Sequence, residues 1–288
     1  MLNRDMKNIK LINGLLLALA LFVASCSSDG DGNLPDLSRV PVPLITQAEN
    51  SDVLIQEPAD FKGKFIVDLY FKDDIKPKSI DVVIAKNGAY DKVKVLQANV
   101  TAYPTTVDID AAKIATAFGI NVSDIIPGDY FEIGANITTQ DGKLSQAFPL
   151  VGNQFAADIA NFPGSNLNIK YPVVCPLDMD AFVGEFTIDD PLFWEASYPV
   201  TVTREGENDL IITGFVEDPA AKIKITVNPQ TTKISVPKQI FAPAFVGYTN
   251  GSAAGSGEIN ACANTITLNL TYTVDQGSFG TYGLTIRK

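Results

Sequence analysis

Apolar and polar residues alternate over short stretches along most of this chain, which is the pattern of β-strands with one buried face. The clearest stretch is 61–71, where Phe65, Val67 and Leu69 occupy every second position. In the first half of the chain the pattern predicts strands over 40–45, 61–71, 80–84, 93–100, 104–110, 130–139 and 143–150. Short strands with turn signals at intervals of about 8–12 residues predict an immunoglobulin-like β-sandwich.

One segment of this half has helical spacing instead. Ile114 and Phe118 lie four residues apart in a stretch rich in alanine. Asp110 precedes the stretch and is a good N-cap, while Gly119 follows it and is a good C-cap. We therefore expect a helix over 111–118.

Residues 151–172 interrupt the strand pattern. They contain the turn residues Pro163-Gly164 and several asparagines and prolines. We place a domain boundary there, near residue 165. The sandwich is assigned to 40–160 and a second β domain to 166–288.

The second half predicts eight strands joined by short turns. Short connections favour antiparallel pairing of sequence neighbours. Eight such strands predict a small up-and-down barrel or a strongly curved sheet, lipocalin-like in outline. The predicted strands are 182–188, 198–205, 209–215, 222–228, 233–240, 255–262, 265–274 and 280–287.

The N-terminal residues have the pattern of an export signal. Lys7 and Lys10 precede an almost wholly apolar run over 11–23, which is too short for a membrane span of ~20 residues. This pattern predicts a signal peptide over 1–25, with Met1 or Met6 as the first residue. The ending Ala24-Ser25-Cys26 resembles a bacterial lipobox, which implies that Cys26 is lipidated. The alternative is an ordinary signal peptide with an incidental cysteine.

A small, polar and acidic stretch follows the cysteine. Ser27 to Asn33 cannot bury apolar surface, so we expect a flexible acidic tether over 26–39. Tethers rich in Ser and Asp directly after the lipid cysteine resemble the surface-export signal of Bacteroidetes-type outer-membrane lipoproteins. The resemblance implies exposure on the cell surface, and a generic spacer on the periplasmic face is the alternative.

Charge narrows the range of partners. The chain has 33 acidic and 22 basic residues, for a net charge of −11, and removal of the leader leaves −13. So acidic a protein repels phosphate backbones, and we expect no nucleic-acid partner. A polybasic mode of membrane attachment is also disfavoured, which leaves the lipid as the anchor.

The chain contains no histidine. Ser-His-Asp and Cys-His catalysis, and zinc or haem sites with histidine ligands, are therefore excluded. Hydrolysis by a carboxylate pair stays chemically possible. We expect no cofactor and no metal. A calcium site from Asp178, Asp180, Asp189 and Asp190 is a weaker alternative, because Asp178-Met179-Asp180 lacks the glycine and glutamate of a helix-loop-helix site.

Cys175 and Cys262 are the two cysteines left after Cys26. An even pair in an oxidising compartment predicts one disulfide. Two buried free thiols are the alternative.

The loop 189–198 is the candidate ligand site. Trp194 is the only tryptophan, and Phe193 and Tyr198 lie beside it in the sequence. Aromatic faces with nearby hydrogen-bonding groups suit a sugar. In the alternative, these aromatics plug the end of the barrel. The polar candidates are Asp189, Asp190 and Glu195.

Taken together, the lipobox at 23–26, the Ser-Asp tether and the two β domains resemble the accessory lipoproteins of Sus-type (starch-utilisation-system-like) glycan-uptake loci. The resemblance implies a non-enzymatic outer-membrane lipoprotein that binds a polysaccharide or supports a TonB-dependent transporter. A carboxylate-pair glycoside hydrolase and a purely structural or adhesive surface lipoprotein are the alternatives.

Overall fold

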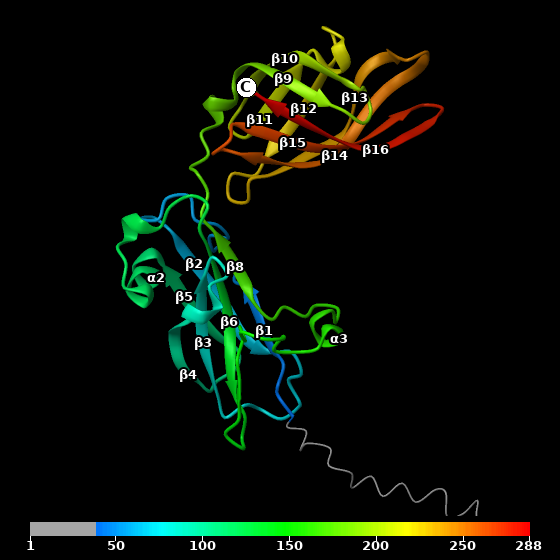
Figure 1. The fold of residues 1–288 in the computed structure, drawn as a ribbon. Coiled ribbons are helices and arrows are strands. Elements are labelled where there is room, and N and C mark those ends of the chain that lie inside the picture. The colour runs from blue at the N-terminus through cyan, green and yellow to red at the C-terminus, as the bar shows by residue number, and fades with distance from the viewer. Residues whose placement is uncertain (1–38) are drawn as a thin grey trace, which may run out of the picture. The chain divides into compact units, whose positions relative to one another are not determined.

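Two layers of antiparallel strands form the first half of the chain (Figure 1). The structure is a computed structural model and describes residues 39–288. The predicted signal peptide, Cys26 and all but the last residue of the predicted tether lie outside the described residues. The strands of this half are β1 (Pro43–Gln47), β2 (Lys62–Leu69), β3 (Ser79–Lys86), β4 (Lys94–Val100), β5 (Thr105–Asp110), β6 (Tyr130–Thr138), β7 (Leu144–Ser145) and β8 (Ile169–Pro172).

These strands form the predicted immunoglobulin-like sandwich. One sheet has the order β1-β2-β5, and the other has the order β4-β3-β6, with β7 and β8 both pairing with the free edge of β6. Alternate residues of each strand point between the sheets, so Phe65, Ile84 and Phe131 are fully buried in one core. The period-two pattern thus predicted both the strands and their buried faces.

The last strand of the sandwich differs from the prediction. The expected strand over 143–150 is only the two residues of β7, and the chain then leaves the sheet until Ile169. It returns as β8 to complete the same edge of β6. The predicted boundary near residue 165 and the sandwich limit at 160 are therefore wrong, because β8 within the Pro- and Asn-rich segment belongs to the sandwich. A short helix, α3 (Ala157–Ala160), lies in the segment between β7 and β8.

The predicted helix is confirmed as α2 (Ala111–Phe118). The Asp110 carboxylate accepts a hydrogen bond from the backbone N–H of Lys113 at 2.7 Å. Gly119 ends the helix in the left-handed region, with φ of 67°. Both caps act as their residue types predict, and Ile114 is buried against the sandwich core.

The second half forms a closed eight-stranded antiparallel barrel. Every strand pairs with its neighbours in sequence, and β9 pairs with both β10 and β16, which closes the ring. The barrel therefore has the up-and-down order predicted from the short turns. Its strands are β9 (Gly184–Asp190), β10 (Ala196–Glu205), β11 (Asp209–Thr213), β12 (Lys222–Val227), β13 (Lys233–Phe245), β14 (Tyr248–Asn260), β15 (Thr265–Val274) and β16 (Gly277–Arg287).

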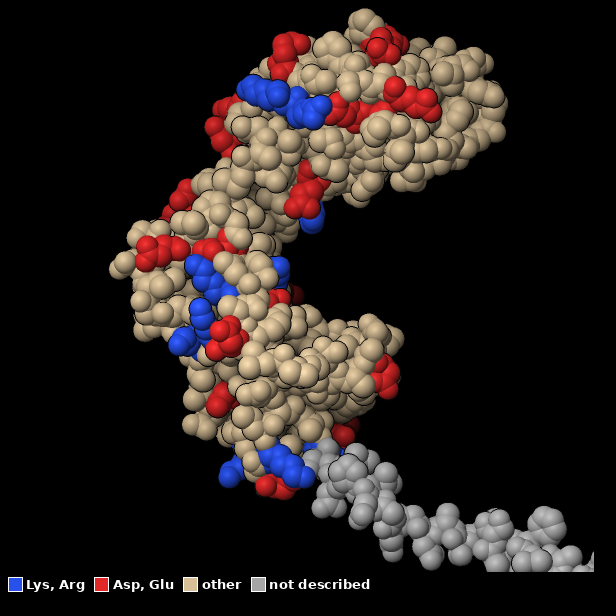
Figure 2. All heavy atoms as spheres, in the orientation of Figure 1, with Lys and Arg blue, Asp and Glu red and all other residues tan. Residues whose placement is uncertain are grey.

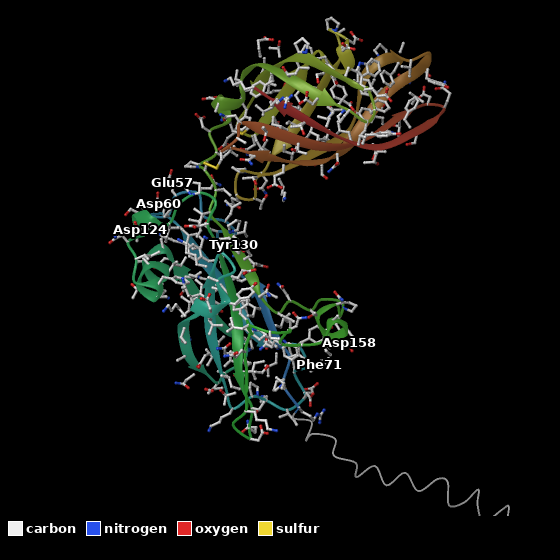
Figure 3. The ribbon with its side chains drawn as sticks, in the orientation of Figure 1. Glu57, Asp60, Phe71, Asp124, Tyr130 and Asp158 are labelled. Carbon is white, nitrogen blue, oxygen red and sulfur yellow. A yellow bond between two sulfur atoms is a disulfide. The ribbon has the colours of Figure 1, made fainter. Side chains whose placement is uncertain are left out.

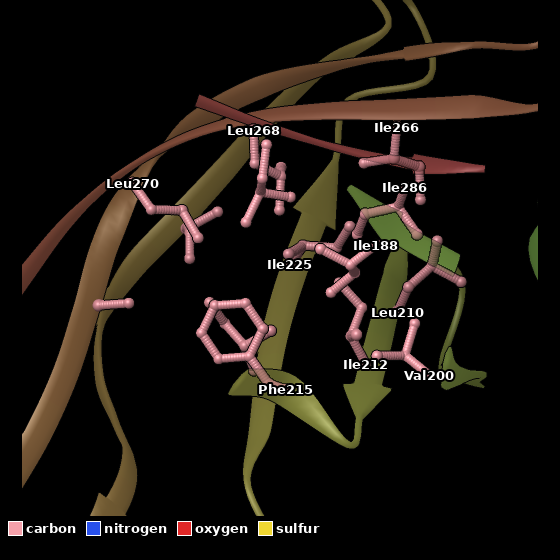
Figure 4. Close-up of a cluster of buried hydrophobic side chains, with 14 of the residues drawn as sticks. Ile188, Val200, Leu210, Ile212, Phe215, Ile225, Ile266, Leu268, Leu270 and Ile286 are labelled. Carbon is pink, nitrogen blue, oxygen red and sulfur yellow. The ribbon is translucent and has the colours of Figure 1, made fainter. Parts of the chain in front are cut away.

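Side chains fill the middle of this barrel (Figure 4). Ile188, Ile212, Leu268 and other aliphatic residues from opposite strands meet there and are fully buried. An interior packed in this way is a core, in contrast to the open ligand cavity of a larger barrel.

The hairpin of β13 and β14 is longer than predicted. The segment 248–252, which lies between the predicted strands 233–240 and 255–262, is part of β14. The turn is instead Val246-Gly247, with φ of 43° and 86°. Two positive φ values suit a tight hairpin, but valine is a poor residue for this conformation. The sequence therefore carried only Gly247 as a turn signal at the true position.

A disulfide links the segment before the barrel to the β14–β15 turn. Cys175 and Cys262 are bonded, with Cα atoms 5.1 Å apart. This is the pairing expected from the number of cysteines. It closes a loop that contains six of the eight barrel strands, from β9 to β14.

Candidate functional site

The predicted ligand loop begins at the end of β9, at one end of the barrel. Phe186, Ile188 and Asp190 all point inward because they occupy alternate positions of the strand. The chain then turns over the barrel end and returns as β10. Phe193 reaches into the barrel from this turn, and its ring stacks on Tyr272 with 3.9 Å between ring centroids.

Phe193 lies at the centre of a cluster of aromatic rings. Its ring also contacts those of Trp194, Phe245, Phe279 and Tyr282, with centroids 5.2–6.5 Å away. Tyr198 is only 1% exposed. The prediction that Tyr198 offers an open face to a sugar is therefore wrong, and Phe193 closes the barrel end as the alternative reading proposed.

Three polar groups are buried beneath this ring cluster. The Tyr198 hydroxyl accepts a hydrogen bond from the backbone N–H of Val216 at 3.2 Å. One carboxylate oxygen of Asp190, Oδ1, accepts from the N–H of Phe193 at 2.9 Å. The other oxygen and the Tyr272 hydroxyl have no hydrogen-bond partner among residues 39–288. Burial, and then the nearby Asp190 carboxylate, raise the pKa of both tyrosines well above the usual value.

Because Asp190 is 1% exposed, it cannot meet a ligand from solvent in this conformation. Its predicted role in hydrogen-bonding a sugar is therefore wrong. Asp190 instead holds the turn that carries Phe193. The inward position of Asp190 follows from the register of β9. The prediction of an exposed loop over 189–198 did not take this register into account.

Trp194 lies between the core and the surface. It is half-buried, and its indole ring stacks on Phe245 at 5.7 Å with an angle of 27° between the planes. Its Nε1–H donates to the Glu217 carboxylate at 2.7 Å. A bond to a carboxylate fixes the orientation of the indole. Of the three aromatic candidates, Trp194 alone reaches a charged group on the surface.

The turn that presents Glu217 has an unusual backbone. Gly214, Val216 and Glu217 all have positive φ, at 92°, 52° and 57°. A β-branched residue in this region is strained, and such strain persists only where the surroundings hold it. Here the Tyr198 hydroxyl binds the N–H of Val216, whose side chain is buried. Strained backbone of this kind is frequent at binding sites.

A surface hollow of about 520 Å³ lies beside this turn. Glu217 borders it, and Glu185 borders it from β9. The Thr201 hydroxyl, also in the lining, donates to the Glu185 carboxylate at 2.9 Å. Hereafter we call this hollow the barrel groove; its lining is Glu185, Tyr198, Pro199, Val200, Thr201, Thr213, Gly214, Glu217 and Pro219.

Asp189 and Glu195 lie on the outer side of the predicted loop, next to a smaller hollow of about 300 Å³. The Asp189 carboxylate accepts from the Ser197 hydroxyl at 2.6 Å and pairs with Arg287 at 2.7 Å. Asp180 pairs with Arg204 at 2.7 Å. In the described part of the chain, no three acidic or cysteine side chains are grouped so as to hold a metal ion. The calcium alternative is therefore not supported.

Sequence reasoning missed most of the barrel groove. Thr213 ends β11, and Glu217 and Pro219 follow it, about 20 residues from Trp194, and no motif joins the two segments. The available signal was Gly214, because an isolated glycine inside the predicted strand 209–215 suggests a bulge or a break. Register then brings the two segments together, because β10 and β11 are neighbours in the barrel.

Comparison with known proteins gives no assignment: the chain matches neither a protein-family model nor a curated protein. Within residues 39–288, no helix has the length and apolar character needed to cross a bilayer.

Proposed function

We propose that this protein is a non-enzymatic, lipid-anchored surface protein of the outer membrane that binds carbohydrate in the barrel groove. In this role it supports glycan uptake by a TonB-dependent transporter. The observation that carries the binding proposal is the strained turn 214–217. This turn fixes Glu217 against Trp194 at the edge of an open hollow.

The chemistry of the barrel groove suits a sugar. Its lining combines carboxylates and threonine hydroxyls with the apolar rings of Pro199 and Pro219. Sugar hydroxyls both donate and accept hydrogen bonds, so carboxylates and hydroxyls on one wall can hold them. The exposed positions of Glu185, Pro199 and Glu217 leave room for a long chain to enter and leave.

The two carboxylates of the barrel groove favour binding over hydrolysis. Glu185 accepts a hydrogen bond from Thr201, and Glu217 accepts one from Trp194. A glycosidase requires one carboxylic acid that donates a proton to the leaving oxygen. Here both groups already act as hydrogen-bond acceptors, so the hydrolase alternative is the weaker proposal.

Native gels that contain a soluble polysaccharide test the site. The probes are xyloglucan, arabinoxylan, galactomannan, dextran and laminarin, run against the chain from Ser27 onward. We expect at least one to retard the protein, and Glu217→Gln to weaken its binding about tenfold, the ~1.4 kcal/mol of one lost charged hydrogen bond.

Glu207→Gln is the matched control, because Glu207 is an exposed glutamate on another turn of the same barrel. It should bind like the natural protein. Equal binding by Glu217→Gln would remove the barrel groove from consideration. Release of reducing ends from the retarding polysaccharide would establish the hydrolase alternative instead.

Cell fractionation tests the anchor separately. Replacing Cys26 with Ala should move the protein from the membrane to the soluble fraction, because a multiply acylated cysteine provides the durable attachment. Membrane association that persists in this variant, together with an acyl label, would contradict the lipobox reading.

A further inference from the structure

A second group of aromatic rings lies on the sandwich and faces solvent. Phe71 and Phe162 are 42% and 40% exposed. The rings of Tyr70 and Phe162 are within 13° of parallel, and Phe71 stands nearly perpendicular to both. Ile75, 43% exposed, follows in the same loop. We call Tyr70, Phe71, Ile75 and Phe162 the entry surface.

The entry surface is built by hydrogen bonds between separate segments. The Tyr70 hydroxyl donates to the carbonyl oxygen of Pro163 at 2.8 Å, which fixes the segment that carries Phe162. The N–H of Ile45 donates to the carbonyl of Asn166 at 2.8 Å and ties the same segment to β1. The rings are therefore held at the surface by the fold.

This surface lies where the chain enters the sandwich. The N–H of Tyr70 donates to the carbonyl of Val42 at 2.9 Å, just before β1 begins. Figure 3 shows Phe71 toward one end of the sandwich and Asp124 toward the other. Only the thirteen residues from Ser27 to Arg39 separate this end from Cys26. Fully extended, they span at most ~45 Å.

The charge of the entry surface does not oppose a membrane. A hollow of about 700 Å³ beside the rings is lined by Tyr70, Phe71, Lys72, Asp73 and Asp74. The loop 70–78 carries three lysines and two aspartates, although the chain from Cys26 onward carries −13. Figure 2 shows basic and acidic side chains side by side at this end. Lys72 also neutralises Asp68, at 2.9 Å.

We propose that the entry surface rests against the headgroup region of the membrane to which Cys26 is anchored. Aromatic rings and lysines are the side chains that prefer this region, because each combines apolar area with a polar or charged end. The short connection to Cys26 keeps the local concentration of membrane near the millimolar range, so a weak contact suffices. The proposal rests on the lipid anchor of the proposed function.

Quenching by brominated lipids tests the contact. The chain from Cys26 onward has one free thiol, because Cys175 and Cys262 are bonded to each other. Cys26 is coupled to a maleimide lipid and inserted into phosphatidylcholine–phosphatidylglycerol vesicles with brominated acyl chains. This coupling makes the test independent of natural acylation. Trp194→Phe removes the natural fluorophore, and Phe71→Trp or, as a second probe, Phe162→Trp reports on the entry surface.

Tyr90→Trp in the same background is the matched control. Tyr90 is 38% exposed and donates to Glu132, toward the opposite end of β6 from the entry surface. We expect brominated lipid to quench the entry-surface tryptophans at least threefold more than the control. Equal quenching, or none at any position, would overturn the proposal. If brominated lipid quenches neither entry-surface tryptophan, and a polysaccharide protects these tryptophans from quenching by acrylamide, the rings bind carbohydrate instead.

The absence of a lipid on Cys26 and the absence of membrane contact by the entry surface give different results. If Cys26 is not acylated in cells, the Cys26→Ala fractionation shows it, and the coupled protein still reports on the entry surface. If the surface does not contact lipid, the coupled protein stays on the vesicles with unquenched probes.

Discussion

The barrel and the sandwich each carry a cluster of aromatic rings, and the two clusters have opposite surroundings. In the barrel, Phe193 stacks on Tyr272 at 3.9 Å inside a ring cluster that closes one end. In the sandwich, Phe71 and Phe162 contact each other at 6.2 Å and stay about 40% exposed. The same residue types thus form a core in one region and a surface in the other.

The difference shows that strand register decides which aromatic side chains can meet a partner. Tyr198 lies on the inward face of β10, so it is buried although Ser197 and Pro199 on either side of it are exposed. Phe71 lies two residues beyond the end of β2 at Leu69 and so escapes the core. Composition alone would favour the loop with the tryptophan as the ligand site. In the structure, most of that loop's aromatic side chains stabilise the barrel instead.

Truncation of Phe193 should have the largest effect. Phe193→Ala removes the ring at the centre of the barrel cluster, and we expect a loss of ~3–4 kcal/mol in the free energy of unfolding. Phe71→Ala is the matched change in the sandwich and should cost less than ~1 kcal/mol, because the ring is exposed. Urea unfolding followed by circular dichroism measures both. Similar losses would break the distinction between the two clusters.

Removal of the disulfide should weaken the barrel and spare the sandwich. The bond joins positions 87 residues apart and encloses six barrel strands. Loop entropy allows up to ~4–5 kcal/mol, and measured effects are typically ~2–4 kcal/mol. Hydrogen exchange of the Cys175→Ser, Cys262→Ser variant should show faster exchange in β9–β16. Equal acceleration in β2 and β6 would show that the two regions unfold together.

The next largest effect on stability comes from Asp129, a carboxylate of the sandwich, and this effect depends on pH. Asp129 is 9% exposed, and burial alone would raise the pKa of its carboxyl. Hydrogen bonds from Lys86 at 2.8 Å, Asn87 at 2.7 Å and the N–H of Ile126 outweigh this and lower the pKa. A lowered pKa stabilises the fold above the unfolded value of ~3.9, and this stability is lost as the pH falls through the folded value.

Asp129→Asn should therefore reduce the free energy of unfolding at pH 7 by ~1–3 kcal/mol. The difference from the natural protein should shrink below about pH 4. Asp60→Asn, at an exposed carboxylate of the same sandwich, is the control. A constant difference at all pH values would mean that Asp129 does not titrate as described.

The buried carboxylate of the barrel should show the smallest effect. Asp190 has one hydrogen bond, from the N–H of Phe193, which an asparagine oxygen can also accept. Its second oxygen has no partner among residues 39–288. Removing the charge then relieves a desolvation penalty, so Asp190→Asn should change stability by less than ~1 kcal/mol in either direction. Thermal melting checks this, and a loss as large as that of Phe193→Ala would show an unrecognised partner.

Local patterns predicted the barrel better than the sandwich. Each barrel strand pairs with its sequence neighbour, so turns and period-two alternation were sufficient to locate all eight strands, although β13 and β14 extend further toward their shared turn than predicted. In the sandwich, β6 pairs with β8 across an excursion of 23 residues, between Ser145 and Ile169. No local signal predicts a return of this kind, since the pairing depends on which sheet edge is left open.

The candidate site could be predicted only in part. Trp194 was found because it is the only tryptophan, but Glu217 has no motif that links it to Trp194. The contact arises because barrel closure places the β9–β10 turn beside the turn after β11. The burial of Asp190 and Tyr198 likewise follows from register, which a reading of the segment as an exposed loop could not give.

Fluorescence of Trp194 tests the central claim, that carbohydrate binds in the barrel groove, most directly. Because the chain has one tryptophan, its emission reports on this site alone. Trp194 is half-buried and bonded to Glu217, so acrylamide should quench it moderately in the free protein. A polysaccharide that retards the protein in native gels should shift the emission and reduce this quenching, and Glu217→Gln should weaken both changes. A polysaccharide that binds the protein yet leaves the emission and quenching of Trp194 unchanged would contradict the account.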